Sequence, residues 1–264
     1  MTMTNGLEWT FDTVTSKYEK MRPGYVPEVY ETIFSYVPIG PGSNVVEVGS
    51  GAGQATGPVL ATGCRLTAVE YGAKFSALLR EKFSGYHAFA VINGRFEETE
   101  FPADSYDLVF SASAFHWIPE KEGYEKVYGM LRKGGAFARF ANRAYADKGR
   151  PKLWNAIQKL YDDYYYTYYK DKKRDLRECT EEIAKERAMI AAKYGFTDIR
   201  YHLFHRQRDF TAKEYTELLG TYSDHIAMEE SARNAFYSKI EEAINDFGGQ
   251  ITIYDTIDLQ LARK

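Results

Sequence analysis

The chain has 264 residues, of which 44% are hydrophobic and 27% charged, so it can bury a full core and disorder is not expected. Its formal net charge of -3 leaves no cationic excess to hold a phosphate backbone, which argues against nucleic acid as a partner. The first residues lack the features of a signal peptide, and no apolar run reaches the roughly 20 residues of a membrane span. Cys64 and Cys179 have neither disulfide-framework nor metal-ligand spacing, so we expect a cytoplasmic protein without a bound metal.

The chain begins with a predicted helical segment, residues 1–37, that contains helices over 13–18 and 27–37 joined through Arg22-Pro23-Gly24-Tyr25. Residues 44–140 then alternate short apolar runs with amphipathic stretches, which predicts a parallel sheet with helices on both faces. The predicted strands are 44–48, 65–69, 88–92, 108–111 and 136–140. The predicted helices are 54–61, 74–83 and 122–131, and the last ends at a stop signal, Arg132-Lys133-Gly134-Gly135.

After residue 142 the pattern changes to longer helices, predicted over 151–169, 178–194, 212–220 and 230–247, with strands 199–205 and 251–261 between them. We interpret 1–264 as one domain. Its core sheet comprises about 40–142, 196–206 and 250–262, and its helical cap comprises about 150–194 and 211–247. Two segments have plain structural interpretations: Tyr161–Tyr169 as packing of the cap, and the charged run 170–175 as a solvated helix end.

The strongest chemical signal is VVEVGSGAGQ, Val45 to Gln54, where a predicted strand runs directly into three glycines, Gly49, Gly51 and Gly53. Glycines let the backbone turn tightly and let a ligand approach with no Cβ in the way. The spacing is G-x-G-x-G, and Gln54 stands where the dinucleotide pattern G-x-G-x-x-G has its last glycine, so a nicotinamide cofactor fits less well.

Two acidic residues accompany the glycine loop. Glu47 precedes it inside the strand, where a carboxylate would meet a cationic ligand or orient the amides of the loop. Glu70 ends the second predicted strand, about 20 residues after the loop, the distance at which an acidic side chain meets ribose hydroxyls. A carboxylate can accept two such hydrogen bonds at once.

With these residues, the chain resembles the class I S-adenosylmethionine-dependent methyltransferases and, among them, the trans-aconitate methyltransferase-like group. The resemblance extends over most of the chain and is carried by Tyr18 with RPGY at 22–25, EVGSGAGQ, Glu70, NGRFEE at 93–98, YDLVFSASAFHW at 106–117 and LRKGGAFA at 131–138. It implies a doubly wound, seven-stranded, mostly parallel α/β sheet with a Rossmann-like fold. The last strand, 251–261, would be inserted antiparallel.

The resemblance also implies a site for S-adenosylmethionine. The glycine loop would lie along the methionine portion of the cofactor, Glu70 would bind the ribose, and Tyr71 would stack on the adenine. Arg95 and Phe96 would lie on the other side of the base. Relatives often have Asp at the position of Arg95, where its carboxylate accepts a hydrogen bond from the adenine amino group, whereas an arginine can only donate hydrogen bonds. Further implied cofactor residues are Tyr18, Arg22, Glu47 and Ser111.

The acceptor is expected to be a small molecule. If it is a carboxylate, the reaction needs no general base, because the acid is already ionised. Arginines at plausible edges would then hold it: Arg22, Arg143, and Arg206 or Arg208. Trp117 and Tyr222 are further candidate substrate residues. For a hydroxyl or amine acceptor, His116 is the leading catalytic base, because it follows the fourth strand where ligands gather. The alternative acceptor is a hydroxyl or ring carbon of an apolar metabolite, which the aromatic residues of the cap suggest.

Two alternatives from other classes remain open at this point. A nicotinamide-dependent oxidoreductase would also use a glycine turn and an acid such as Glu70, although Gln54 argues against it. A cofactor-binding protein without catalysis would keep the loop while its acceptor pocket was blocked. The oligomeric state does not follow from the sequence.

Overall fold

A computed structural model describes residues 15–147, 149–169 and 176–264 of the chain. The predicted charged helix end at 170–175 and the first two residues of the helix predicted over 13–18 lie outside this part. The chain divides into two compact units, which are described separately. The sheet unit contains Pro23–Asn142, Cys179–Phe204 and Ile257–Lys264; the helical unit contains the described residues up to Arg22, Arg143–Glu178 and His205–Thr256.

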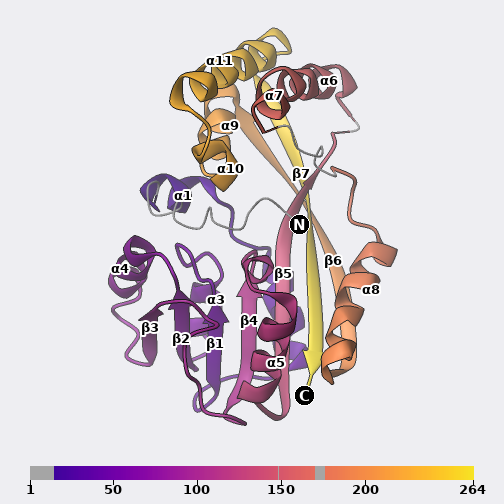
Figure 1. Ribbon diagram of the computed structural model, residues 1–264. Coiled ribbons are helices and arrows are strands. Elements are labelled where there is room, and N and C mark those ends of the chain that lie inside the picture. The colour runs from indigo at the N-terminus through magenta and orange to yellow at the C-terminus, as the bar shows by residue number, and fades with distance from the viewer. Residues whose placement is uncertain (1–14, 148, 170–175) are drawn as a thin grey trace. The chain divides into compact units, whose positions relative to one another are not determined.

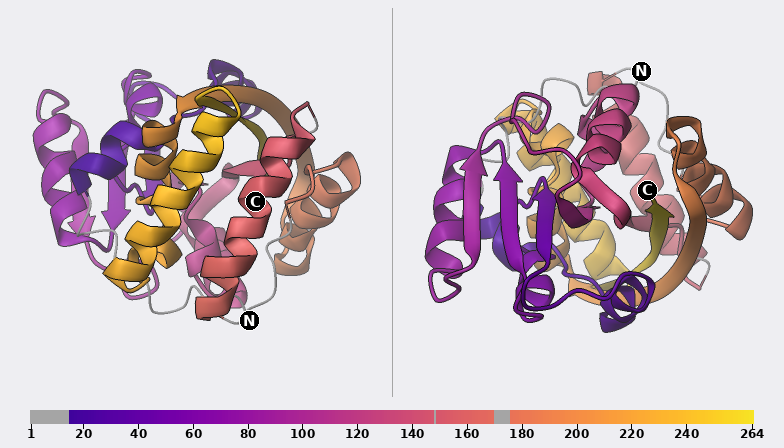
Figure 2. Two further views of the ribbon diagram at one scale, coloured as in Figure 1. Left: turned by 90° about the horizontal axis from the view of Figure 1, so that it is seen from above. Right: turned by 90° about the horizontal axis from the view of Figure 1, so that it is seen from below.

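The sheet has seven strands in the order β3-β2-β1-β4-β5-β7-β6. Their bounds are β1 Asn44–Val48, β2 Arg65–Glu70, β3 Phe89–Asn93, β4 Tyr106–Ala112, β5 Leu131–Tyr145, β6 Thr197–Thr211 and β7 Gln250–Arg263. Strands β1 to β5 pair in parallel, and β1 to β3 lie side by side in Figure 2. β7 runs in the opposite direction between β5 and β6 (Figure 1). The predicted seven-stranded, mostly parallel fold with an inserted antiparallel last strand is confirmed.

Both faces of the sheet are covered, as the alternating pattern predicts. One face buries Val45, Leu66 and Leu108 under α2 (Pro27–Tyr36), α3 (Thr56–Leu60) and α4 (Ala73–Lys82). The other buries Val46 and Val109 under α5 (Glu120–Met130) and the 3-10 segment η4 (Ile190–Tyr194), which follows α8 (Glu181–Met189). Successive strand residues point to opposite faces, so strands buried on both sides read as continuous apolar runs.

One predicted turn is part of a strand. The sequence Arg132–Gly135 reads as a stop signal, but α5 ends at Met130 and β5 begins at the next residue. Tyr106 pairs with Leu131 while Leu108 pairs with Ala136, so the extra residues of β5 form an irregularity in the ladder. A bulge of this kind changes direction without ending the strand, and a glycine pair favours bulges as much as turns.

The helical unit has its own core. It contains α1 (Thr15–Met21), α6 (Pro151–Leu160), the π segment η3 (Tyr161–Tyr165), α7 (Tyr166–Tyr169), α9 (Ala212–Leu219), α10 (Ser223–Ile226) and α11 (Glu230–Asp246). Tyr161, Tyr165 and Phe236 are buried there. The ring of His225, which is fully buried, lies within 3.3 Å of the Tyr161 hydroxyl and 3.2 Å of the Tyr237 hydroxyl. The tyrosine-rich segment therefore packs the interior, as predicted. None of the described helices is long and apolar enough to span a membrane.

The two units differ from the predicted partition into core and cap. Residues 178–194 carry a helical pattern and are predicted to join the cap, but α8 and η4 cluster with the sheet. Ala191 packs on the same face as Val46, because small side chains allow this segment close approach to the strands. The predicted N-terminal segment is also divided: α1 clusters with the helical unit and α2 with the sheet.

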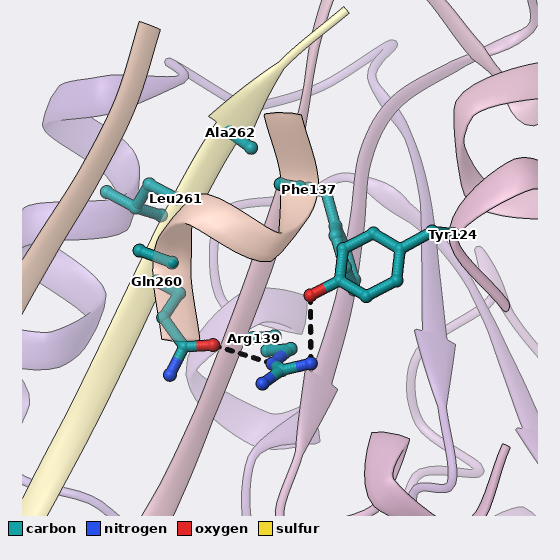
Figure 3. Close-up of a pocket in the computed structure, with 8 residues that line it drawn as sticks. Tyr124, Phe137, Arg139, Gln260, Leu261 and Ala262 are labelled. Carbon is teal, nitrogen blue, oxygen red and sulfur yellow. Dashed lines mark hydrogen bonds between the residues drawn. The ribbon is translucent and has the colours of Figure 1, made fainter. Parts of the chain in front are cut away.

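A chain of buried and half-buried polar side chains connects β5, α5, β7 and α8 within the sheet unit. Arg139 on β5 donates from Nε to Gln260 Oε1 at 2.6 Å and from Nη1 to the Tyr124 hydroxyl at 2.9 Å (Figure 3). Gln260 in turn donates to Asp258 Oδ2 at 3.1 Å, and Arg187 of α8 lies 3.0 Å from the same oxygen. Because Asp258 is fully buried, its charge depends on these partners.

We therefore expect Asp258→Ala to lower the free energy of unfolding by about 3 kcal/mol, since it leaves the charge of Arg187 without its carboxylate. Urea denaturation followed by circular dichroism measures this. The matched control is Glu125→Ala, which removes an exposed carboxylate 4.0 Å from Lys121 and should cost about 0–1 kcal/mol. Equal losses in the two variants would show that the buried pair has no special role in stability.

Candidate cofactor site

The glycine loop after β1 is closely packed. Gly49 and Gly53 have positive φ angles of 72° and 78°, which L residues with a Cβ rarely adopt. A Cβ on Gly49 would lie 2.4 Å from the Cβ of Ala114, and a Cβ on Gly53 would lie 2.6 Å from Cε2 of Phe83. The loop thus passes tightly between the segment after β4 and the end of α4, and only glycine satisfies both contacts.

Glu70 ties this loop to the end of β2. Its Oε2 accepts a hydrogen bond from the amide of Gly51 at 2.8 Å, and its Oε1 accepts from the amide of Gly72 at 2.7 Å. The side chain is only 9% exposed. Backbone amides therefore hold the carboxylate in place at the carboxyl end of β2. Hydrogen bonds from amides stabilise the charged form of a carboxylate.

Glu47 has a different environment from Glu70. It is fully buried in β1, the middle one of the five parallel strands, and its Oε2 accepts a hydrogen bond from the Thr56 hydroxyl at 2.6 Å. Its Oε1 has no hydrogen-bond partner among the described residues, and the same holds for Ser50 Oγ and Gln54 Nε2. Burial raises the pKa of Glu47 to about 8, and the charge of Glu70 acts in the same direction.

Tyr71, Arg95 and Phe96 follow the next two strands. Tyr71 is 47% exposed, and the Arg95 guanidinium carbon lies 4.6 Å from the centre of its ring. Phe96 is buried and contacts Phe101 with ring centres 5.9 Å apart. The structure thus leaves Tyr71 accessible for stacking and places the ring of Phe96 in the core.

The segment after β4 holds the remaining predicted residues of the sheet unit. Ser111 is buried and donates to the carbonyl of Val48 at 2.8 Å, so its hydroxyl joins β4 to β1. His116 is exposed on a short 3-10 turn, η2 (Phe115–Trp117), with its ring 5.1 Å from that of Trp117. Phe115 anchors this turn by packing 4.8 Å from the ring of Phe137.

Ser113, in the same segment, has a backbone conformation that its residue type does not predict. It has a positive φ of 55°, which is uncommon for a residue other than glycine. Its hydroxyl lies 2.8 Å from the Tyr25 hydroxyl and accepts a bond from the Asn142 amide at 3.3 Å. Strained backbone of this kind is frequent at functional sites, but nothing in the residue type predicts it.

The other predicted residues lie in the helical unit. The Arg22 guanidinium carbon lies 4.1 Å from the ring centre of Tyr222 and 5.1 Å from that of Tyr18. Its Nη2 donates to the Thr221 carbonyl at 3.0 Å, and its Nε has no hydrogen-bond partner among the described residues. Arg143, near the end of β5, is half-buried.

Two arginines considered for the acceptor are engaged elsewhere. Arg208 Nε lies 2.7 Å from Oδ2 of Asp255, and Arg206 Nη2 lies 3.3 Å from the same oxygen. Asp255 is almost fully buried, so both guanidinium groups compensate its charge. This arrangement gives Arg206 and Arg208 a structural role.

The sheet unit fits S-adenosylmethionine by its own chemistry. It combines a backbone cradle that Cβ atoms would fill, a carboxylate beside it, an exposed aromatic ring, and three buried polar atoms without partners among the described residues. These features match a ligand that carries a ribose, a purine and a zwitterionic amino acid.

Comparisons with known proteins agree with this fit. Residues 46–138 match the family described as methyltransferase domain. An uncharacterised methyltransferase of Schizosaccharomyces pombe is 22% identical, over 89% of this chain and 87% of the relative. A solved structure of a putative type II methyltransferase from Anaeromyxobacter dehalogenans has a TM-score of 0.61 and 17% identity, covering 92% of this chain and 97% of that one.

The fold is also similar to phosphoethanolamine N-methyltransferase 2 of Haemonchus contortus, solved with phosphomonomethylethanolamine and S-adenosylhomocysteine. That likeness has a TM-score of 0.57 and 16% identity, and it covers 96% of this chain but 57% of the longer protein. The match over 46–138 includes the glycine loop, Glu70 and the turn after β4, and it decides against the oxidoreductase alternative. The chain therefore carries an S-adenosylmethionine-dependent methyltransferase domain with the class I fold.

Proposed function

We propose that the sheet unit binds S-adenosylmethionine through the glycine loop, Glu70 and Tyr71, and that the chain transfers its methyl group to a small carboxylic acid. The observation that carries the cofactor part is the carboxylate of Glu70, which is fixed by two backbone amides beside the glycine loop. A carboxylate held in this way is ready to accept hydrogen bonds from the two hydroxyls of a ribose.

The bound cofactor supplies a methyl group on a sulfonium, which leaves as a neutral thioether. The residues of this chain then need to align the acceptor and exclude water, and alignment alone can account for much of the rate enhancement. In this proposal, the close packing of Gly49 and Gly53 keeps the backbone of the glycine loop rigid where the cofactor lies against it. Ser111 and Ser113 hold the segment after β4, which forms the edge nearest the methionine portion.

A carboxylate acceptor is supported by the resemblance to the trans-aconitate group and by the state of the arginines. The guanidinium of Arg22 lies over two aromatic rings, and its buried Nε has no hydrogen-bond partner among the described residues. A guanidinium fixed in this way can bind a carboxylate with little further loss of entropy. Arg143 and Tyr222 are the accompanying candidates, while Trp117 is proposed to line the acceptor side of the turn after β4.

A second candidate is transfer to a hydroxyl, an amine or the ring carbon of an apolar metabolite. The observation in its favour is the exposed imidazole of His116, on a turn whose neighbour Phe115 is anchored in the core. A neutral imidazole there would act as a general base, which such acceptors need and a carboxylate does not.

For the cofactor, we expect Glu70→Ala to weaken binding of S-adenosylmethionine by about 1–3 kcal/mol, through loss of charge-assisted bonds to the ribose. Isothermal titration calorimetry measures this, with thermal unfolding of the free variant as a check on the loop. Glu98→Ala, which removes an exposed carboxylate of the same unit, is the matched control and should bind normally. Unchanged affinity in a folded Glu70→Ala protein would remove Glu70 from the site.

For the acceptor, we expect labelled methyl transfer to a di- or tricarboxylate and none to its neutral amide. Arg22→Ala should lower kcat/KM by about tenfold or more, since a charge-assisted bond is worth roughly 1.5–3 kcal/mol. Arg80→Ala, which changes an exposed arginine on α4, should have no effect. If acids are inert while a phenol or amine is methylated, with a rate that falls as His116 is protonated, the second candidate replaces the first.

A further inference from the structure

Glu47 lies on β1, the middle one of the five parallel strands, two residues before Gly49 of the glycine loop. Its neighbours in the strand register are Ala68 on β2 and Phe110 on β4, which offer no charge and no side-chain hydrogen bond. The side chain is fully buried. Isolated ionised carboxylates are strongly disfavoured in such surroundings unless a cation or several donors compensate them.

No cation compensates Glu47 among the described residues. The hydroxyl of Thr56, on α3, donates to its Oε2 at 2.6 Å, and Ser50 is the other side chain that favours its ionised form, while its Oε1 accepts no hydrogen bond from the described residues. The titratable groups that face it are Glu70 from β2 and Tyr30 from α2, and both are acids. Burial raises the pKa of Glu47 to about 8, and it raises the pKa of Tyr30 as well. Full burial without a cation thus favours the protonated form of Glu47, whereas the carboxylate of Glu70 has two amide donors.

The methyl donor changes this balance, whereas the product does not. S-adenosylmethionine carries a sulfonium in addition to its ammonium and carboxylate, so its net charge is positive, and the demethylated product has a net charge of zero. A positive charge bound along the loop favours the ionised form of Glu47, and the low dielectric of the interior strengthens the effect. Ser50 Oγ and Gln54 Nε2, also without partners among the described residues, can reorient toward the new charges.

We propose that Glu47 carries a proton in the free protein and releases it when the cationic methyl donor binds, so that it selects the donor over the uncharged product. The inference rests on the proposed cofactor site. The proton passes from the carboxyl group to the solvent on donor binding and is taken up again once methyl transfer has removed the cofactor's net charge. Donor binding is thus favoured by rising pH, and product release is favoured by reprotonation of Glu47.

The sign of the pH effect follows from linkage. If the donor-bound state has the lower pKa for Glu47, it binds fewer protons, so the affinity for the donor increases with pH between the bound and free pKa values. The ratio of product Kd to donor Kd should therefore rise from pH 6 to pH 9. The rise is about tenfold for each pKa unit by which the sulfonium lowers the pKa of Glu47.

The test is calorimetry of the wild-type chain with S-adenosylmethionine and with S-adenosylhomocysteine, at pH 6–9 and at pH 7 in two buffers of different ionisation enthalpy. We expect more protons released with the donor than with the product, and a rising Kd ratio. Binding of both ligands with equal proton release and a Kd ratio constant within about twofold would overturn the inference. Absence of binding at every pH would instead contradict the proposed function.

Two variants sharpen the result. Glu47→Gln keeps the shape of the side chain but cannot ionise, so the Kd ratio should become independent of pH. Thr56→Val removes the hydroxyl that favours the ionised form, so the transition should move to higher pH. Thr32→Val, which changes a half-buried residue of α2 whose hydroxyl donates to the Glu28 carbonyl of the same helix, is the control. The proton release of the wild type needs no variant, so the inference stays testable if Glu47→Gln does not fold.

Discussion

The carboxylate of Glu70 connects two of the turns that follow the carboxyl ends of the parallel strands, and the candidate site is built from these turns. By accepting from the amides of Gly51 and Gly72, it joins the turn after β1 to the turn after β2. Both turns precede helices, α3 and α4, so one side chain sets the spacing of two strand-helix connections. The glycine loop can approach α4 and the segment after β4 closely because its position is fixed from this side.

Glu47 and Glu70 lie close to the glycine loop in different electrostatic environments. Glu70 accepts hydrogen bonds from two backbone amides, and Glu47 is fully buried and accepts from the Thr56 hydroxyl. Burial and the nearby charge of Glu70 both favour a proton on Glu47. Two carboxyl groups in such different surroundings can accept hydrogen bonds from a neutral sugar and respond to a cation at the same time. This division of roles underlies the proposed discrimination between donor and product.

The arginines illustrate how burial divides residues that look alike in the sequence. Arg206 and Arg208 compensate the buried Asp255, whereas Arg22 lies over the rings of Tyr18 and Tyr222 and has a buried Nε with no hydrogen-bond partner among the described residues. Arg139 and Arg187 belong to a third arrangement, the polar chain through Gln260 and Asp258. Only an arginine whose charge is not already neutralised can contribute strongly to binding an acid.

The sequence alone determined the order of strands and helices along the chain, the glycine loop and the place of Glu70 at the end of the second strand, because apolar periodicity and the need for positive φ are local properties. The tertiary structure decided the rest. It assigned α8 to the sheet, turned Arg132–Gly135 from a turn into a strand irregularity, and showed the strained backbone of Ser113. It also showed that Arg206 and Arg208 form ion pairs with Asp255 while the Nε of Arg22 has no hydrogen-bond partner among the described residues. No cation compensates Glu47 in this part of the chain. These properties depend on which distant residues share a buried environment, and no local pattern of residue types records that.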